Sequence, residues 1–453
     1  MPPILALIIC IIFVLWLLTL DHKSSPDNSL ALWIPTIWVL LIAGKPLGVW
    51  FYSGPRADGE MGSPLDRNFI ITLIILGLII LLKRRFSFSK AVKDNYLLIF
   101  LAAFTLLSTL WSNIFFTSLA RWIREILTAL IMSFVMLSEN NPREAMLSIL
   151  RKTTYIHVPF SLLLIKYYPL LGVQYGRWSG DIMWIGVTTQ KNGLGILCLI
   201  AVFFLSWSLI RRRRNHNIHT VRYQTIAEIF LLILSLLLLK GPSILAMSAT
   251  SATSLAAGLA AFIVLLRLSK SKIYPSANTL SVITIAVIII GTLSVFNEGQ
   301  TVGFLTSSVG RDSTLTGRTD IWRQYLPMAM QHPLLGHGFG GFWTKETIAY
   351  QGVNSVHNGY LEVILYLGFI GLILVSLFLL SSCQRAQQIM KDDFYWVSLW
   401  LCFLFMSILH NIGESSLDSF SRILTAILVF QYVASSSMIK DYKNLNTDHT
   451  IER

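Results

Sequence analysis

Long apolar stretches recur along the whole of this 453-residue sequence and restrict what it can fold into. A helix needs about 20 predominantly apolar residues to cross a hydrocarbon core of about 30 Å. Runs of that size follow one another from end to end, and charged residues make up only 13% of the chain. An ordinary soluble domain carries about twice that charged fraction. The sequence therefore predicts an all-α, polytopic membrane protein.

The apolar runs suggest about 12 to 13 transmembrane helices. The predicted spans are residues 3–20, 30–50, 68–82, 96–111, 118–138, 145–168, 192–210, 224–240, 243–267, 275–296, 357–381, 394–411 and 419–437. The lower count applies if one of the first two runs is re-entrant or interfacial. The first run lacks the positive flank and the small-residue cleavage site of a secretory signal, so we expect it to be a span.

Basic residues, which give the chain a net charge of +13, gather in short loops between the spans. Short basic loops are typical of the cytoplasmic side of a membrane protein, so this charge does not indicate nucleic-acid binding. The loops predicted to be cytoplasmic are 83–93, 211–222, 268–274 and 384–393. By alternation, the loops predicted to lie outside are 171–191, 241–243, 297–356 and 412–418.

Four regions follow from this topology. They are an N-terminal transmembrane bundle (1–296), an outer loop with interfacial helices (297–356), C-terminal transmembrane helices (357–437) and a cytoplasmic tail (438–453). The outer loop is too long to be a plain connection, and long loops of this kind are usually functional. The four cysteines stand singly in apolar runs, and neither a Cys/His spacing nor a D-x-D cluster occurs. We therefore expect no disulfide, no metal and no cofactor.

A histidine stands at the start of the apolar run SVHNGYLEVILYLGFIGLIL. On a continuous helix, Gly368 and Gly371 would return close to the face of His357, which predicts that another helix approaches there. An ionisable side chain at membrane depth indicates a functional site, and histidine can accept a proton from a hydroxyl. The alternative is a histidine that is only hydrogen-bonded at a helix end. Asn358, the next residue, is a supporting candidate.

A second candidate site lies in the stretch GRTDIWRQYLPMA of the long outer loop. Apolar residues from Thr319 onward recur at helical spacing and predict a short amphipathic helix at the membrane surface. Arg318 would stand at its N-terminal end, where an anion is favoured, and Arg311 lies upstream in the same loop. With Asp320 in support, the two arginines could hold a phosphate. The alternative is an interfacial helix with snorkelling arginines.

Further cations lie in or near the other outer loops. The candidates for anion binding are Arg177, Lys191, Arg121 and Arg124. Lys191 and Asn192 begin a span as His357 and Asn358 do. For the RWIRE stretch at 121–125, an internal ion pair with Glu125 is the alternative. GHGFGG satisfies G-x-G-x-x-G, but no βαβ unit surrounds it, so we interpret it as a tight or flexible loop.

The spacing H-N-x9-G-x-x-G, filled by His357, Asn358, Gly368 and Gly371, resembles the signature of the O-antigen ligase/polysaccharide polymerase superfamily. GRTDIW and HPLLGHGFGGFW resemble the region that precedes this signature. TLTGRTDIW, QKNGLG and LWIPTIWVLLIAGKPLG with GSPLDRN look closest to the exopolysaccharide-polymerase branch. Two positions depart from the pattern: Gln190 replaces a histidine, so no catalytic role is assigned to it, and His337 replaces a tyrosine and is a weak candidate.

The resemblance implies a glycosyltransferase of the bacterial inner membrane whose catalytic loops face the periplasm. It implies an inverting, metal-independent transfer of a glycan from undecaprenyl pyrophosphate to the hydroxyl of an acceptor, which is a glycan or the lipid A core. His357 would be the general base, and the outer arginines, Arg318 first, would bind the pyrophosphate. The bilayer and other polysaccharide assembly proteins are the expected partners, and nucleic acid is not.

Several alternatives remain open. Polymerisation is favoured over ligation to the lipid A core, because the N-terminal block looks closest to exopolysaccharide polymerases. A transporter of solutes such as inorganic carbon would need charged residues deep in several spans. We expect the spans to be nearly free of charge apart from the Arg121–Glu125 group and Lys166. A non-catalytic scaffold is disfavoured by the intact motifs.

Overall fold

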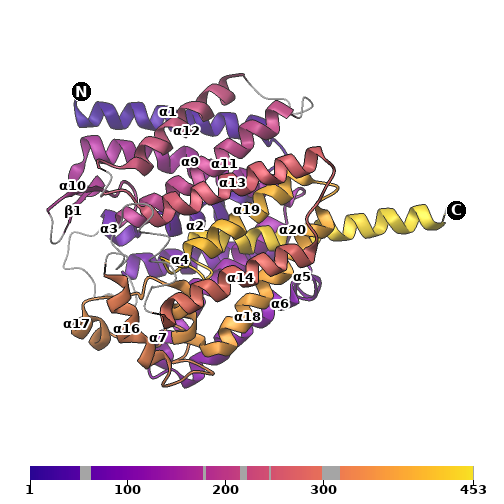
Figure 1. Ribbon diagram of the computed structural model, residues 1–453. Helices are drawn as coiled ribbons and strands as arrows, with labels where there is room; N and C mark the ends of the chain where they lie inside the picture. Colours follow the sequence, from indigo (N-terminus) through magenta and orange to yellow (C-terminus); the bar gives the residue numbers. More distant parts are fainter. Residues whose placement is uncertain (52–62, 177–179, 215–221, 244–245, 298–316, 452–453) are drawn as a thin grey trace. The chain divides into compact units, whose positions relative to one another are not determined.

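The computed structural model describes residues 1–51, 63–176, 180–214, 222–243, 246–297 and 317–451. Nearly all of the regular structure in these residues is helical (Figure 1), which confirms the prediction of an all-α, polytopic membrane protein. The exception is a short antiparallel hairpin of β1 (Val173–Tyr175) and β2 (Ile182–Trp184). This hairpin lies within the predicted outer loop 171–191.

The chain divides into two compact units. Unit 1 comprises Met1–Tyr52, Ile75–Arg84 and Met132–Leu266, and unit 2 comprises Ser53–Ile74, Arg85–Ile131 and Arg267–Arg453. Three helices are shared between them: α4 (Pro64–Lys83), α8 (Thr128–Leu137) and α13 (Ala249–Lys270). The division by regions that the sequence suggested, with borders at 297 and 357, stays a prediction.

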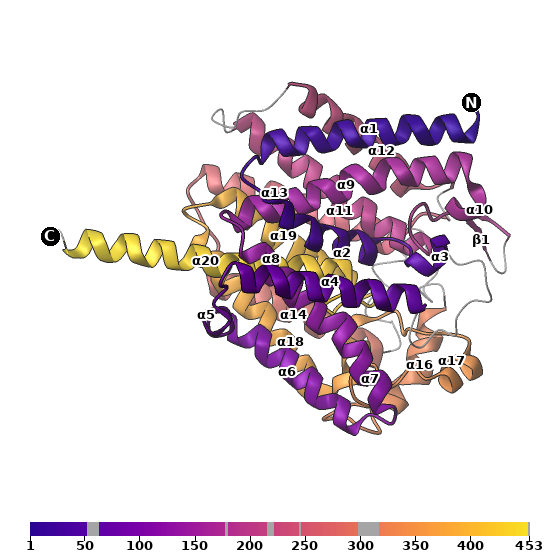
Figure 2. The ribbon, with the colours of Figure 1, turned by 180° about the vertical axis from the view of Figure 1, so that it is seen from behind.

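Unit 1 is built around α9, which contacts α1, α2, α11 and α12. Its elements are α1 (Pro3–Ser24), η1 (Leu30–Leu32), α2 (Trp33–Ala43), α3 (Leu47–Phe51), α9 (Pro142–Tyr167), α10 (Pro169–Gly172), α11 (Lys191–Arg214) and α12 (Arg222–Lys240). Figure 2 shows α1 running beside α9 and α12. Ala6, Cys10 and Val14, four residues apart along one face of α1, pack against Leu163 of α9. This spacing is typical of a helix that buries a single stripe.

Unit 2 is built around α18, which contacts α6, α14, α16, α19 and α20. Its elements are α5 (Phe88–Asp94), α6 (Tyr96–Ser108), η2 (Thr109–Trp111), α7 (Phe115–Trp122), the π-helical turn η3 (Ile123–Leu127), α14 (Ala277–Phe296), α16 (Arg318–Ala329), α17 (Lys345–Gln351), α18 (Gly359–Ile389), α19 (Phe394–His410) and α20 (Ile423–Ile451). The predicted amphipathic helix is α16, and its apolar face is buried through Trp322, Tyr325 and Ala329. His357 and Arg318, the leading candidates from the sequence, both belong to this unit.

Each predicted span coincides with helical structure, although not every span is one long helix. Within the described residues, seven helices are long and apolar enough to cross a membrane, or eight if the bent pair of α5 and α6 is one span. Three shorter apolar helices, at Leu30–Ala43, Phe394–His410 and Ile423–Met438, coincide with further predicted spans. Other runs are interrupted, as where the π-helical turn separates α7 from α8. The count of 12 to 13 crossings stays a prediction.

The expectation that the spans are nearly free of charge is wrong. Asp21 of α1 is buried, and its carboxylate oxygens lie 2.9 Å from Arg151 Nη1 and 3.5 Å from Lys152 Nζ of α9. Glu228 of α12 is also buried and pairs with Arg212 of α11. Buried charges persist where an opposite charge compensates them, and each of these carboxylates has such a partner. Because the spans do contain buried charges, a lack of charge cannot be used as an argument against a transporter.

Candidate functional site

His357 is held in an uncommon backbone conformation immediately before α18. Its φ is +52°, in the left-handed region that few residues other than glycine adopt. The helix begins at Gly359 because Asn358 is its N-cap: the Asn358 Oδ1 atom accepts hydrogen bonds from Tyr360 N and Leu361 N, both at 3.0 Å. Asn358 Nδ2 also donates to Ile412 O, at 3.1 Å, in the loop that follows α19. The asparagine of the motif thus fixes where the histidine stands.

The prediction that Gly368 and Gly371 share a face of one continuous helix with His357 is wrong. His357 is not part of the helix, and Gly368 breaks it, with φ +64° and ψ −167°. A Cβ atom on Gly368 would lie 2.2 Å from the backbone of Leu334, so only glycine allows this approach. The approaching element is the loop that carries HPLLGHG, not a second helix.

This loop forms hydrogen bonds with the backbone groups of α18 that have no partner within the helix because of the break at Gly368. Leu365 O accepts from His337 N at 2.9 Å, and Phe369 N donates to Pro333 O at 2.7 Å. The backbone groups of a broken span are thereby paired within the protein, as the interior of a membrane protein requires. Of the glycines of GHGFGG, Gly336 packs against the backbone of Tyr366 in α18, and three of the four have positive φ. The interpretation of this stretch as a tight loop is confirmed.

The His357 side chain meets a carboxylate that the sequence did not point to. His357 Nδ1 lies 3.2 Å from Glu414 Oε2, and Arg318 Nη2 lies 2.6 Å from Glu414 Oε1. Arg318 also donates to the carbonyl oxygen of Gly413. We call His357, Glu414 and Arg318 the Glu414 cluster. It brings together the two strongest candidates from the sequence, which stand on separate segments of unit 2.

Burial differs among the three side chains of the Glu414 cluster. The Glu414 side chain is 9% exposed, that of Arg318 15% and that of His357 29%. Burial acts to raise the pKa of the Glu414 carboxyl, but the hydrogen bond from His357 and the charge of Arg318 outweigh it. The pKa of Glu414 therefore lies below its ordinary value of 4.5, and the group is an anion at neutral pH. The carboxylate is shielded while the imidazole stays accessible.

Glu414 was missed because it lies in a short polar loop, residues 411–422, that no motif marks. One signal was available: Glu414 and Asp418 are acidic residues in a short loop between two apolar runs. Glu362 was missed as well, although it stands only five residues after His357 in an otherwise apolar run. It is buried and accepts hydrogen bonds from Val356 N and the indole of Trp343.

The arginines of the RWIRE stretch are engaged within the protein. Arg121 donates to the backbone carbonyl groups of Gly340 and Trp343 and so fixes the loop that follows GHGFGG. Arg124 Nη2 lies 2.7 Å from Glu125 Oε1, which is the ion pair that we considered as the alternative. A role for either arginine in anion binding stays a prediction.

The remaining candidates lie in other parts of the chain. Arg177 and Arg311 lie outside the described residues. Lys191 and Asn192 begin α11 in unit 1, with Gln190 directly before them. Asp320 is largely exposed and pairs with Arg323 at 3.3 Å.

His337 is packed inside the loop that bears it. Its Nε2 atom donates to Met328 O at 3.1 Å, and its ring lies against those of His332 and Phe342. Burial lowers the pKa of the His337 imidazole, against the raising effect of the hydrogen bond to Met328 O. These contacts favour a packing role for His337.

The fold and the site together define a multi-pass membrane protein with a histidine–carboxylate–arginine cluster beside a broken span. Residues 237–376, which include His357 and α16, match the family model described as O-antigen ligase. The chain is also similar to the exopolysaccharide production protein ExoQ of Rhizobium meliloti (strain 1021), with 29% identity over 104 residues. That similarity covers 20% of this chain and spans 24% of the relative's length. These two findings support the similarity to the O-antigen ligase/polysaccharide polymerase superfamily.

Proposed function

We propose that this chain is a membrane glycosyltransferase that moves a glycan from undecaprenyl pyrophosphate to the hydroxyl of an acceptor sugar, lengthening a polysaccharide. The Glu414 cluster carries the proposal, because one carboxylate joins the proposed base, His357, to the proposed anion ligand, Arg318. The family match supports the class of reaction. The identity of donor and acceptor comes from the resemblance of the motifs to that family.

His357 is the proposed general base. An ionised carboxylate can only accept hydrogen bonds, so Glu414 requires that His357 Nδ1 carry the ring hydrogen. In the neutral imidazole the Nε2 atom is then the acceptor. It would take the proton of the acceptor hydroxyl as the oxygen attacks the anomeric carbon from the side opposite the leaving group. Glu414 would orient the ring and stabilise the imidazolium that forms.

Arg318 is the proposed ligand of the pyrophosphate. As the bond from the anomeric carbon to the phosphate oxygen breaks, negative charge develops on the leaving group, and a fixed guanidinium stabilises it. Gly413 O and Glu414 hold the Arg318 side chain from one side, which limits its motion. A metal ion is not needed for this charge, because arginine stays protonated at all working pH values.

The proposed topology puts loops 83–93, 211–222, 268–274 and 384–393 in the cytoplasm and 297–356 in the periplasm. A reporter fusion or cysteine labelling at residue 340 tests this arrangement. A cytoplasmic residue 340 would contradict the whole mechanism, because the lipid-linked donor would then be on the wrong face.

Polymerisation is proposed over ligation to the lipid A core, supported by the similarity to an exopolysaccharide production protein. The test is the size distribution of lipid-linked glycans in cells with and without this protein. If the protein is a polymerase, its deletion leaves single repeat units on the carrier. If long lipid-linked chains accumulate and only their attachment to the core is lost, the protein is a ligase.

A further inference from the structure

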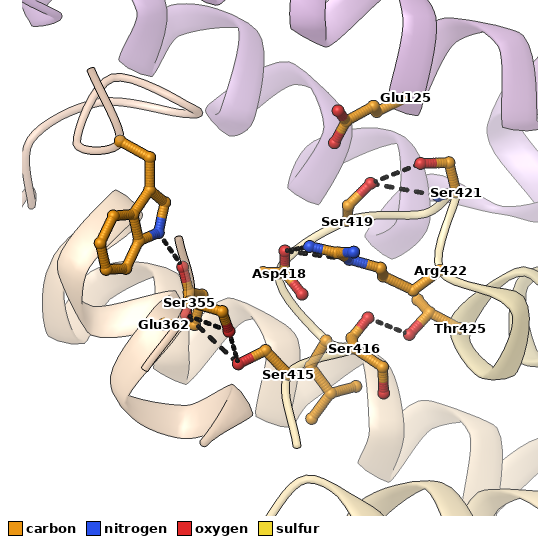
Figure 3. A network of polar contacts seen from close by, with 12 residues as sticks. Glu125, Ser355, Glu362, Ser415, Ser416, Asp418, Ser419, Ser421, Arg422 and Thr425 are labelled. Carbon is orange, nitrogen blue, oxygen red and sulfur yellow. Dashed lines mark hydrogen bonds and ion pairs between the residues drawn. The ribbon is translucent and has the colours of Figure 1, made fainter. Parts of the chain in front are cut away.

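Glu362 is a buried carboxylate that gathers hydrogen-bond donors from three separate segments of unit 2 (Figure 3). Its residue is 2% exposed. Oε2 accepts from Val356 N at 3.0 Å and from Ser415 Oγ at 3.2 Å, and Ser355 Oγ lies 3.3 Å away. Oε1 accepts from the indole nitrogen of Trp343. The Glu362 side chain, in the first turn of α18, thus links the residues that precede this helix to the loop that follows α19.

The contacts of Glu362 lie next to both members of the proposed histidine–carboxylate pair. Ser355 Oγ accepts a hydrogen bond from His357 N at 3.2 Å, and Val356 directly precedes the histidine. Ser415 directly follows Glu414, and its hydroxyl lies 3.1 Å from that of Ser355. Among the described residues, Glu362 forms no hydrogen bond with His357 or Glu414. Its effect on them runs through these neighbouring residues.

The backbone at His357 needs such support. A residue other than glycine with positive φ persists only where its surroundings hold it there, and residues of this kind concentrate at functional sites. Val356 is fixed at both of its polar backbone atoms, since its N–H donates to Glu362 and its carbonyl oxygen accepts from Trp322 Nε1 at 3.0 Å. These two bonds anchor the peptide groups that lead into the strained position.

The two side-chain oxygens of Glu362 suit this task. Each of them faces an N–H group that can only donate, Val356 N at Oε2 and the Trp343 indole at Oε1, so both oxygens act as acceptors. A glutamine has one acceptor oxygen and an NH2 group, which would face either the Trp343 indole or the donors on Oε2. Glu362→Gln therefore keeps the volume and removes half of the acceptor function.

We propose that Glu362 is a positioning residue that sets the distance between His357 and Glu414. It does so by holding Ser355 and Val356 on one side and Ser415 on the other. This inference rests on the proposed function for its effect on glycan transfer, but the geometry it claims can be tested without transfer.

The first experiment measures transfer by the full-length protein in a lipid bilayer with a lipid-linked glycan donor. A misplacement of a reacting group by about 1 Å can cost about 10²-fold in rate. We expect Glu362→Gln to lower kcat by about that factor, with the donor KM within about twofold of wild type and with partial rescue by Glu362→Asp. In a His357→Ala background, Glu362→Gln should cause no further loss, because residues that act as a unit are not additive.

The second experiment measures how fast diethyl pyrocarbonate modifies His357 in the same protein, read by mass spectrometry. We expect Glu362→Gln to change this rate in the same direction as Glu414→Gln. Ser415→Ala, which removes one contact, should give a smaller change in that direction and serves as the variant of choice if Glu362→Gln does not fold. These rates decide the inference even if the wild-type protein transfers no glycan, which would overturn the proposed function alone.

Arg385→Lys is the matched control. Arg385 lies in the other end of α18 and donates to Asn95 Oδ1 at 3.1 Å and Tyr432 O at 3.2 Å, so it holds a polar network unrelated to His357. It should change neither turnover per folded molecule nor the rate of His357 modification. If Glu362→Gln behaves like this control while Glu414→Gln alters the modification rate, Glu362 is not a positioning residue.

Discussion

Two carboxylates in this protein are each shared between two basic side chains, and they differ in what surrounds them. In unit 1, Asp21 meets Arg151 and Lys152, and none of these three side chains is more than 9% exposed. In unit 2, Glu414 meets Arg318 and His357, and the histidine is 29% exposed. The first set lies within regular helices, whereas His357 and Glu414 lie outside them.

The difference supports a structural role for the buried charges of unit 1 and the proposed chemical role for the Glu414 cluster. The Asp21 group is closed, and its charges compensate one another between two packed helices. The Glu414 cluster keeps its histidine accessible and holds it in a strained backbone conformation, which a purely structural pair does not need. An ion pair by itself therefore does not indicate a functional site, whereas the exposure and backbone strain of His357 support the proposed one.

The largest effect is expected for His357→Ala. A general base typically contributes about 10² to 10⁴ in rate, so glycan transfer should fall by that factor while the protein still inserts and accumulates. The measurement is turnover per folded molecule in reconstituted membranes. Near-normal product from this variant would show that the Glu414 cluster, like the Asp21 group, has only a structural role.

Asp21→Ala should lower the stability of the protein and leave its turnover per folded molecule unchanged, the opposite of His357→Ala. Removing one partner of a buried pair leaves an uncompensated charge and typically costs about 3 to 5 kcal/mol of stability. Thermal unfolding in detergent should show this loss, while turnover per folded molecule stays close to wild type. A selective loss of turnover with unchanged unfolding would mean that the Asp21 group takes part in the chemistry.

Arg318→Ala is expected to damage activity far more than Arg323→Ala. Removing one fixed donor to developing negative charge costs about 10² in kcat, whereas the Arg323 side chain is 60% exposed and its pair with Asp320 contributes little. Arg318→Lys should rescue poorly, since an ammonium cannot replace a planar fork of donors. Equal turnover of the two alanine variants would argue against a pyrophosphate site at Arg318.

The smallest effect concerns acid stability. The pKa of Glu414 is lowered in the folded protein, so its pairing stabilises the fold above the ordinary value of 4.5. That contribution is lost as the pH falls below 4.5 toward the lower folded-state pKa. Melting temperatures measured from pH 6 down should therefore fall more steeply for wild type than for Glu414→Gln. Parallel curves for the two proteins would show that Glu414 does not gain stability from its partners.

The sequence by itself determined the class of fold, because apolar runs and basic loops are local properties, and each segment's preference for lipid or water follows from its own residues. It also determined the start of α18, since Asn358 caps the helix through atoms two and three residues away. The tertiary structure alone decided that Glu414 reaches His357 and that the loop at Leu334 fills the break at Gly368. These contacts join distant positions in the chain, and helical periodicity carries no information about which loops meet. Helical periodicity predicts one continuous helix from His357 to Gly371, whereas long-range packing stabilises the strained backbone at His357 and the break at Gly368.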